Sequence, residues 1–573
     1  MDTGINIEKK FKLSGELTER KLKEYFPALL ITNLSTLLLV TVDGLVVGNL
    51  VGKDALSSVN IFSPATAFIG VLSALLASGI ATRLSEGMGK IDLNALLTTR
   101  STLKLLMVLG AILVGLVQIP LVWLVISSYH LTPEINAMTW NYAIGVMISM
   151  PFGLISTIGV FQLQAVGKMK VLMGLSCMEG LVNLGLDLLL VGPVGLGVAG
   201  AGYGTAGANI VRCTVTVIYL AKKTDMYYSG NVKPSIPEIR SILYYGLPEG
   251  SHSLMKAIQS YAMISIILSM IGETGGVIKG VWAFALSLCL VLTNGVQGAM
   301  RPMAGLLSGA QDYKGLHLLM KQGIRMLILF AGLLTVFVEL FPQLIYTIHG
   351  IDEIPAGGIM GLRLAALSMV FNGINALFRL YFSNRKLQKF STILTITGNA
   401  TLPLFAFILG TIFSSVWLWL SYLLTELVLF TANTIRFRKV IAADRKTEGT
   451  GETDLYLTVK PEEAIEASRH IRQYAAEEGL NSKHAFRIAL CMEEMVAYAV
   501  SSNESTNVTL QIMIRFFPDS AMLMIIDDGK CIFLDREAEK QKIITTNYGL
   551  LKKLSKSVSY QYVLNMNYTV CRY

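Results

Sequence analysis

The chain has 573 residues, of which 53% are hydrophobic and only 15% are charged, and its formal net charge is +9. This composition excludes an ordinary soluble globular protein and indicates an integral membrane protein. The positive charge gathers beside apolar segments, as is typical of residues at a membrane surface, so it does not indicate nucleic-acid binding.

Apolar runs recur along most of the chain, and about twelve of them are long enough to cross roughly 30 Å of hydrocarbon as a helix. The predicted fold class is therefore an all-α polytopic membrane protein. The expected spans lie near residues 26–50, 58–84, 101–127, 137–162, 170–192, 196–220, 241–271, 279–303, 322–347, 357–383, 391–412 and 415–436.

Lysine and arginine mark one side of these spans. Residues 1–25 are too polar to be a cleaved signal peptide, and they share a side with basic loops such as 221–240 and 383–389. The positive-inside rule places both termini in the cytoplasm. The expected location is a prokaryotic-type cell (inner) membrane.

An internal repeat divides the spans into two sets of six. Pro27 and Gly89 in the first set have counterparts in Pro248 and Gly309 of the second, at nearly equal separations. Such parallel repeats are typical of transporters that bind substrate between two lobes. The predicted parts are a tail (1–25), a first lobe (26–222), an inter-lobe loop (223–240), a second lobe (241–440), a linker (441–454) and a C-terminal domain (455–573).

Four polar residues of the first lobe are expected at one depth in the membrane. Asp43, Asp187 and Thr205 lie at similar numbers of residues from cytoplasmic lysines, and Asn183 precedes Asp187 by one turn. Two carboxylates, an amide and a hydroxyl are hard oxygen ligands for a small cation, and buried carboxylates can instead carry a proton.

Several segments resemble the multidrug and toxic compound extrusion (MATE) family, namely "FPALLITNLSTLLLVTVDGLVVGNLVGKDAL", "LQAVGKMK", "NLGLDLLLVGPVGLGVAGAGYGTA", "YGLPEG" and "RPMAGLLSGAQD". The resemblance implies twelve helices in two lobes and export coupled to H+ or Na+. It also implies that Asp43, Asn183, Asp187 and Thr205 form the first-lobe cation site, with Na+ as a possible ligand. For Glu179, two interpretations stay open, a cavity position below this site or a hydrogen bond to a neighbouring helix.

The second lobe departs from the family pattern. Glu249 resembles a seventh-helix glutamate of one family branch, but Asn372, Asn375 and Arg379 stand where a partner aspartate is expected. Glu249 could pair with Arg379, contact a cationic substrate, or be a buried hydrogen-bonded residue. Further substrate contacts are expected from Gln162, Gln164 and Gln297.

The C-terminal domain alternates strand-like and amphipathic helical patterns, which predicts an α/β sandwich. It resembles the histidine-kinase-like ATPase domain of anti-sigma-factor regulators, in degenerate form. Tyr498 stands where that family has the asparagine that binds Mg2+, so nucleotide binding is possible but hydrolysis is not expected. The remnants of the nucleotide site would be Glu494, Tyr498, Asp527, Gly529 and Gly549.

The predicted function is an ion-coupled antiporter that exports cationic or amphipathic small molecules and requires no cofactor. It is not expected to be an enzyme. The C-terminal domain, residues 455–573, is expected to regulate transport, with a cytosolic regulatory protein as its partner. A lipid-linked precursor flippase and a transporter-derived membrane sensor remain alternatives.

Overall fold

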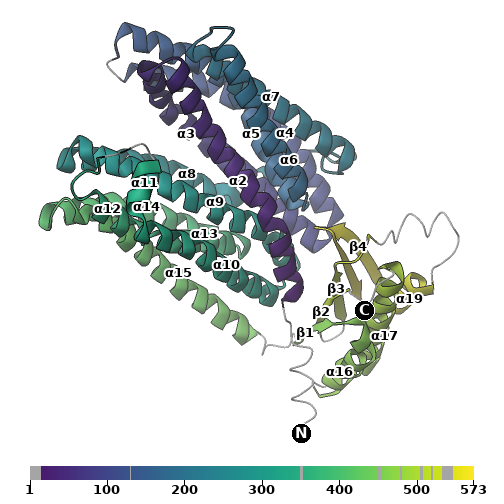
Figure 1. The fold of residues 1–573 in the computed structure, drawn as a ribbon. Coiled ribbons are helices and arrows are strands. Elements are labelled where there is room, and N and C mark those ends of the chain that lie inside the picture. The colour runs from purple at the N-terminus through teal and green to yellow at the C-terminus, as the bar shows by residue number, and fades with distance from the viewer. Residues whose placement is uncertain are drawn as a thin grey trace.

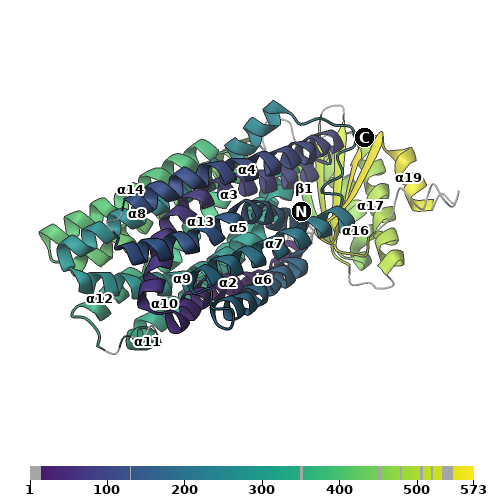
Figure 2. The ribbon, with the colours of Figure 1, turned by 90° about the horizontal axis from the view of Figure 1, so that it is seen from above.

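The computed structural model describes residues 15–128, 131–348, 351, 353–447, 453–477, 481–503, 508–517, 520–531 and 546–573. Long helices fill most of it, and a small sheet with its own helices lies at one end of the helical part (Figures 1 and 2). The first half contains α2 (Glu16–Leu50), α3 (Lys53–Lys90), α4 (Leu93–Ser127), α5 (Pro133–Ala165), α6 (Met169–Val191) and α7 (Val198–Lys223).

The second half begins with α8 (Ile236–Ile271), so the helix starts inside the expected inter-lobe loop. Likewise, α2 begins inside the expected tail and α15 runs into the expected linker. The remaining elements are α9 (Glu273–Gly309), α10 (Tyr313–Leu340), α11 (Pro342–Ile348), α12 (Gly358–Ala366), α13 (Met369–Asn384), α14 (Gln388–Ile412), the 3-10 helix η1 (Trp417–Trp419) and α15 (Leu420–Thr447).

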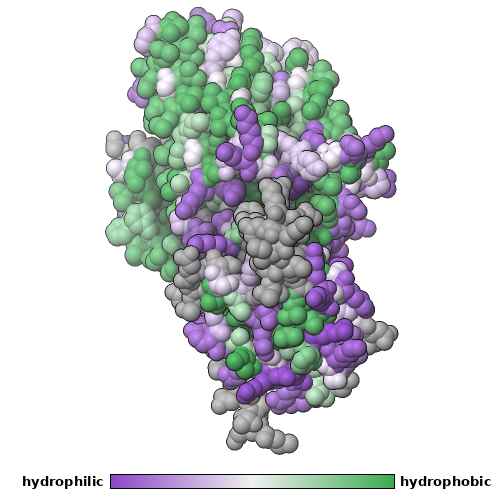
Figure 3. Space-filling view, turned by 90° about the vertical axis from the view of Figure 1, so that its right-hand side faces the viewer, coloured by the Kyte–Doolittle hydropathy of each residue, from purple (hydrophilic) through white to green (hydrophobic). Residues whose placement is uncertain are grey.

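Within the described residues, eleven helical segments are long and apolar enough to cross a membrane. The predicted count of twelve is therefore not confirmed. Helix α7 has a suitable length but is not among the eleven, because its glycine, threonine and asparagine residues lower its hydropathy. Apolar side chains cover much of the helical part, whereas hydrophilic ones predominate on the C-terminal domain (Figure 3). Such a surface suits contact with lipid along the helices.

The internal repeat has a structural counterpart in two turns. Ile91 follows α3 and Gln311 follows α9, and both have a positive φ, 50° and 58°, which is uncommon for residues other than glycine. Asp92 and Asp312 come next and cap α4 and α10 by accepting a backbone hydrogen bond, at 3.0 and 2.7 Å. The two halves therefore repeat the same turn and cap.

The two halves touch through backbone at the end nearer the C-terminal domain. A Cβ at Gly89 of α3 would lie 2.1 Å from the carbonyl oxygen of Leu306 in α9. A Cβ at Gly309 of α9 would lie 2.2 Å from the carbonyl oxygen of Glu86 in α3. Only glycine permits this approach. We call this contact of α3 with α8 and α9 the seam.

An ion pair crosses the seam beside these glycines. Arg83 of α3 donates from Nε and one terminal nitrogen to the two carboxylate oxygens of Glu238 in α8, at 3.0 and 2.9 Å. The hydroxyl of Thr99 also donates to Glu238, at 2.7 Å. Paired, hydrogen-bonded charges of this kind fix the register of the halves rather than adding much stability.

The C-terminal domain is a five-stranded antiparallel sheet of order β1-β2-β3-β5-β4, with helices packed on one face. This agrees with the predicted α/β layers. The elements are β1 (Thr453–Val459), η2 (Pro461–Glu463), α16 (Ala464–Glu477), α17 (Ser482–Asn503), β2 (Leu510–Phe516), β3 (Ala521–Asp527), α19 (Thr546–Leu554), β4 (Ser557–Val563) and β5 (Met566–Arg572).

The other face of this sheet packs on the helical part, so that both faces of β2 are buried. Met513, Met524 and Tyr568 belong to the same apolar cluster as the transmembrane helices, whereas Leu457 and Ile512 belong to the cluster beneath α16 and α17. The sheet is therefore a middle layer between its own helices and the bundle.

Polar contacts tie this sheet to both halves of the bundle. The Tyr568 hydroxyl donates to the carbonyl of Gly89 in the first half, at 2.9 Å. Arg515 donates to the side chain of Gln311 in the second half, at 3.0 Å. The sheet thus bridges the repeated turns on either side of the seam. Further contacts to the first half come from Tyr25, whose hydroxyl donates to the Leu564 carbonyl at 2.6 Å, and from Arg20, which pairs with Asp528.

Candidate functional site

Helices α6 and α7 bring three of the four predicted cation-site residues together. Asn183 and Asp187 lie one turn apart on α6 and are 1% and 0% exposed. A Cβ at Gly204 of α7 would lie 1.9 Å from a carboxylate oxygen of Asp187, so the glycine lets the α7 backbone reach the carboxylate. Thr205 follows directly on α7, and its hydroxyl donates to the Ala201 carbonyl at 3.1 Å.

The Asn183 amide has neither its oxygen nor its nitrogen hydrogen-bonded to any residue in the described part of the chain. Buried amides are nearly always satisfied, since an unpaired one costs free energy. A small cation between these two side chains would be coordinated by the Asn183 oxygen, and it would neutralise the charge of the Asp187 carboxylate. The donor set therefore fits Na+, and the carboxylate alone fits a proton.

Asp43, the fourth predicted residue, lies on α2, and α2 packs against α6. The helix backbone places it on the expected element, but its side chain is outside the described part of the structure. The participation of Asp43 in the cation site therefore stays a prediction.

Glu179 pairs with Arg212 of α7, one turn along α6 from Asn183. Of the two interpretations left open, the structure favours the interhelical contact. Arg212 was missed by the sequence analysis, although its place inside a predicted span was a sufficient signal, because intramembrane charges are costly and usually paired.

Arg212→Met is expected to destabilise the protein by about 3–5 kcal/mol, since it leaves the buried Glu179 carboxylate without its partner. The measurement is thermal unfolding of the purified protein in detergent. The double variant Glu179→Gln, Arg212→Met should recover most of the loss, and failure of this rescue would show that the pair is not the origin of the effect.

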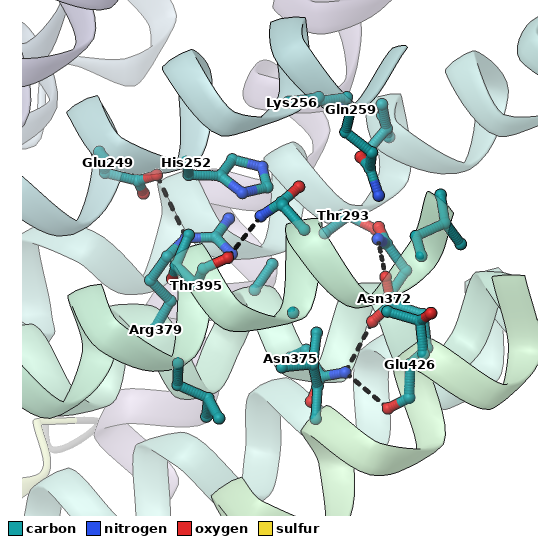
Figure 4. Close-up of a pocket in the computed structure, with 18 of the residues that line it drawn as sticks. Glu249, His252, Lys256, Gln259, Thr293, Asn372, Asn375, Arg379, Thr395 and Glu426 are labelled. Atoms are coloured by element: carbon teal, nitrogen blue, oxygen red, sulfur yellow. Dashed lines mark hydrogen bonds and ion pairs between the residues drawn. The ribbon is translucent and has the colours of Figure 1, made fainter. Parts of the chain in front are cut away.

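The second half contains a polar cavity of about 330 Å3 lined by α8, α9, α13, α14 and α15 (Figure 4). Glu249 accepts from Arg379 at 3.3 Å and from Gln297 at 3.2 Å, and Arg301 lies 3.6 Å away. The predicted pairing of Glu249 with Arg379 is therefore present. Two guanidinium groups converge on one carboxylate, so its charge is already compensated without a bound cation.

Glu426 of α15 is a second carboxylate in this cavity, and it is not among the residues predicted from the sequence. Asn372 donates to one of its oxygens at 2.6 Å and Asn375 to the other at 2.7 Å (Figure 4). The two asparagines that replace the expected aspartate thus hold a carboxylate from another helix. A single glutamate in a predicted last span was the available signal.

The remaining predicted substrate residues do not meet in this cavity. Gln297 lines it, whereas Gln162 and Gln164 lie buried near the end of α5 and are not among its lining residues. The amide nitrogen of Gln162 faces the sulfur of Met107 at 3.7 Å.

The predicted nucleotide-site remnants lie in three places of the C-terminal domain. Glu494 and Tyr498 are one turn apart on α17, and Gly549 lies within α19 rather than in a loop. Asp527 accepts from the Asn567 amide at 2.7 Å and from the Gly529 backbone at 2.9 Å. Burial raises the pKa of Asp527 to about 6, although these two hydrogen bonds partly oppose the rise. Both hydrogen bonds go to one carboxylate oxygen, and the other makes none within the described residues.

Comparison with known proteins supports a transporter fold. The MatE family model matches residues 28–189 and 254–408, which is more than half of the chain. No match was found among curated proteins.

Similar solved structures include an outward-facing multidrug resistance MATE family transporter of the MOP superfamily and a MATE protein in complex with MaL6. Each has a TM-score of 0.70 and 20% identity, and each covers 75% of this chain and 97% of its own. A MOP superfamily transporter from Pyrococcus furiosus, described as having a binding pocket of reverse polarity, is 20% identical with a TM-score of 0.68 and covers 74% of this chain and 96% of its own.

These structures match over nearly their whole length, and the family model ends at residue 408, so this chain extends beyond them. The match lies within the helical part that carries both candidate sites. The chain therefore belongs to the MatE family of membrane transporters.

Proposed function

We propose that the protein is an antiporter that exports small molecules across a cell membrane against an inward flow of H+ or Na+. The observation that carries the proposal is the buried pair Asn183 and Asp187, with an unsatisfied amide beside a carboxylate. The substrates expected from the sequence are cationic or amphipathic. Both termini would lie in the cytoplasm, so the seam would close the cytoplasmic side.

The test is transport by the purified full chain in lipid vesicles. We expect an imposed pH gradient or Na+ gradient to drive accumulation of a probe, with ethidium as a cation and a coumarin carboxylate as an acid. Accumulation under one gradient and not the other identifies the coupling ion. Transport of neither probe under either gradient, with binding retained, would favour a flippase or a sensor.

We further propose that the C-terminal domain regulates this transport. The support is its position, because the sheet contacts Gly89 and Gln311 on opposite sides of the seam. Alternating access requires the seam to open, and the sheet cannot keep both contacts when the halves separate. The docked domain would therefore favour the state that is closed to the cytoplasm, and a cytosolic partner that undocks it would release transport.

This domain is expected to show no magnesium-dependent ATP hydrolysis. Tyr498 offers no amide oxygen for Mg2+, and the Asp527 carboxylate is held by Asn567. Phosphate release by the purified full chain measures the activity. Hydrolysis above the level of a Glu494→Gln variant would contradict the expectation and show that the domain is an active ATPase.

A further inference from the structure

We propose that the second-half cavity binds an organic anion or zwitterion, and that Lys256 and Arg379 receive its carboxylate or phosphate group. The inference rests on the proposed function in taking this ligand as the exported substrate. It replaces the expectation of a simple organic cation with a substrate that carries an acidic group.

Both carboxylates of the cavity are already engaged by the protein. Glu249 has two guanidinium groups and an amide around it, and Glu426 has an asparagine amide on each oxygen. The charge of Glu249 is compensated within the protein, and each oxygen of Glu426 already accepts a hydrogen bond. An organic cation therefore gains less from either group than it would from a carboxylate without partners.

The basic residues of the cavity, unlike its carboxylates, have donor groups that no protein acceptor engages within the described residues. Lys256 lies on α8 two turns after Glu249, so both side chains share one helix face and line the cavity (Figure 4). Lys256 forms no hydrogen bond or ion pair with any residue that the structure describes. Arg379 uses only its Nε toward Glu249, and no other donor of its guanidinium group is engaged within the described residues.

The charges at the cavity consequently sum to a positive value. Arg301, Arg379 and Lys256 contribute three positive charges against the two carboxylates Glu249 and Glu426. Lys256 is under the opposing charges of Glu426 and Arg379. The excess of positive charge at membrane depth therefore favours a ligand that supplies negative charge and disfavours a cation. The polar side chains nearby, His252 and Gln259, can hydrogen-bond the polar remainder of such a ligand.

The experiment measures binding to the purified full chain without any ion gradient. The probes are one fluorescent coumarin in four forms: the carboxylate, the phosphate ester, the uncharged methyl amide and a trimethylammonium derivative. We expect the carboxylate or the phosphate ester to bind at least about tenfold more tightly than the amide and the cation. Preference between the two acidic forms identifies the group that the substrate carries.

Lys256→Gln is expected to abolish this preference, whereas Lys256→Arg retains the charge and should keep it. The matched control is Lys279→Gln, because Lys279 lies outside the cavity on α9 and donates to the Ser260 carbonyl. Tighter binding of the cation by the wild-type protein, or an unchanged preference in Lys256→Gln, would overturn the inference. Binding of the acid without gradient-driven export would instead refute only the proposed antiport.

Discussion

Asp187→Asn is expected to abolish gradient-driven export and leave the protein folded in the membrane. Asp187 is fully buried, and the Gly204 backbone of α7 lies directly against its carboxylate. Asparagine keeps the shape of the side chain but can neither release a proton nor neutralise a sodium ion. Export measured in vesicles should fall to the level of protein-free vesicles under both a pH and a Na+ gradient.

The matched control is Glu273→Gln, which removes an exposed carboxylate at the start of α9. Its export should equal that of the wild-type protein. Asn183→Ala should weaken the response to Na+ more than the response to H+, because it removes a metal ligand and leaves the titrating group in place. Normal export by Asp187→Asn would show that the coupling site lies elsewhere.

Removal of the C-terminal domain is expected to shift the transporter toward the state that is open on the cytoplasmic side. The contacts to Gly89 and Gln311 are worth about 1 kcal/mol each, so their loss would change the ratio of the two states roughly 30-fold. A chain that ends after Thr447 should retain ion-coupled export. The distance between spin labels at the exposed positions Lys222 and Lys389, on opposite halves, reports the shift.

A point variant separates loss of the contact from loss of the whole domain. Tyr568→Phe removes only the hydroxyl that reaches Gly89, and it should shift the labels in the same direction by a smaller amount. Cys491→Ser serves as the control, since Cys491 lies on α17 and belongs to the domain's own apolar cluster, not to the cluster shared with the bundle. Identical label distances in the full and the shortened chains would exclude the regulatory role of the docked sheet.

The sequence alone predicted those features of the structure that depend on a pattern of residues close together in the chain. Hydropathy predicted the helical part, the positions of Pro27 and Gly89 relative to Pro248 and Gly309 predicted the repeat, and alternation predicted the C-terminal sheet. Helical spacing also placed Asn183 and Asp187 on one face of α6. These features depend on local periodicity and on burial, which a single chain displays directly.

Contacts between distant segments could not be predicted in the same way. The pairing of Glu426 with Asn372 and Asn375 joins α15 to α13, and the pairing of Arg212 with Glu179 joins α7 to α6. Each partner was visible as a polar residue in an apolar run, but nothing in the sequence specifies the rotation of one helix against another. The docking of the sheet on the seam could not be predicted either, because either face of a buried strand could have been the one that packs on the bundle.

The glycine contacts of the seam have a consequence for the energy supply of the cell. Gly89 and Gly309 bring the backbones of α3 and α9 together, so no side chain separates the two helices at these positions. An exporter that used an ion gradient but let protons pass between its halves would discharge the membrane at every cycle. A bulkier residue at either position would separate the helices, and we expect it to raise the proton leak of vesicles that contain the protein even when no substrate is present.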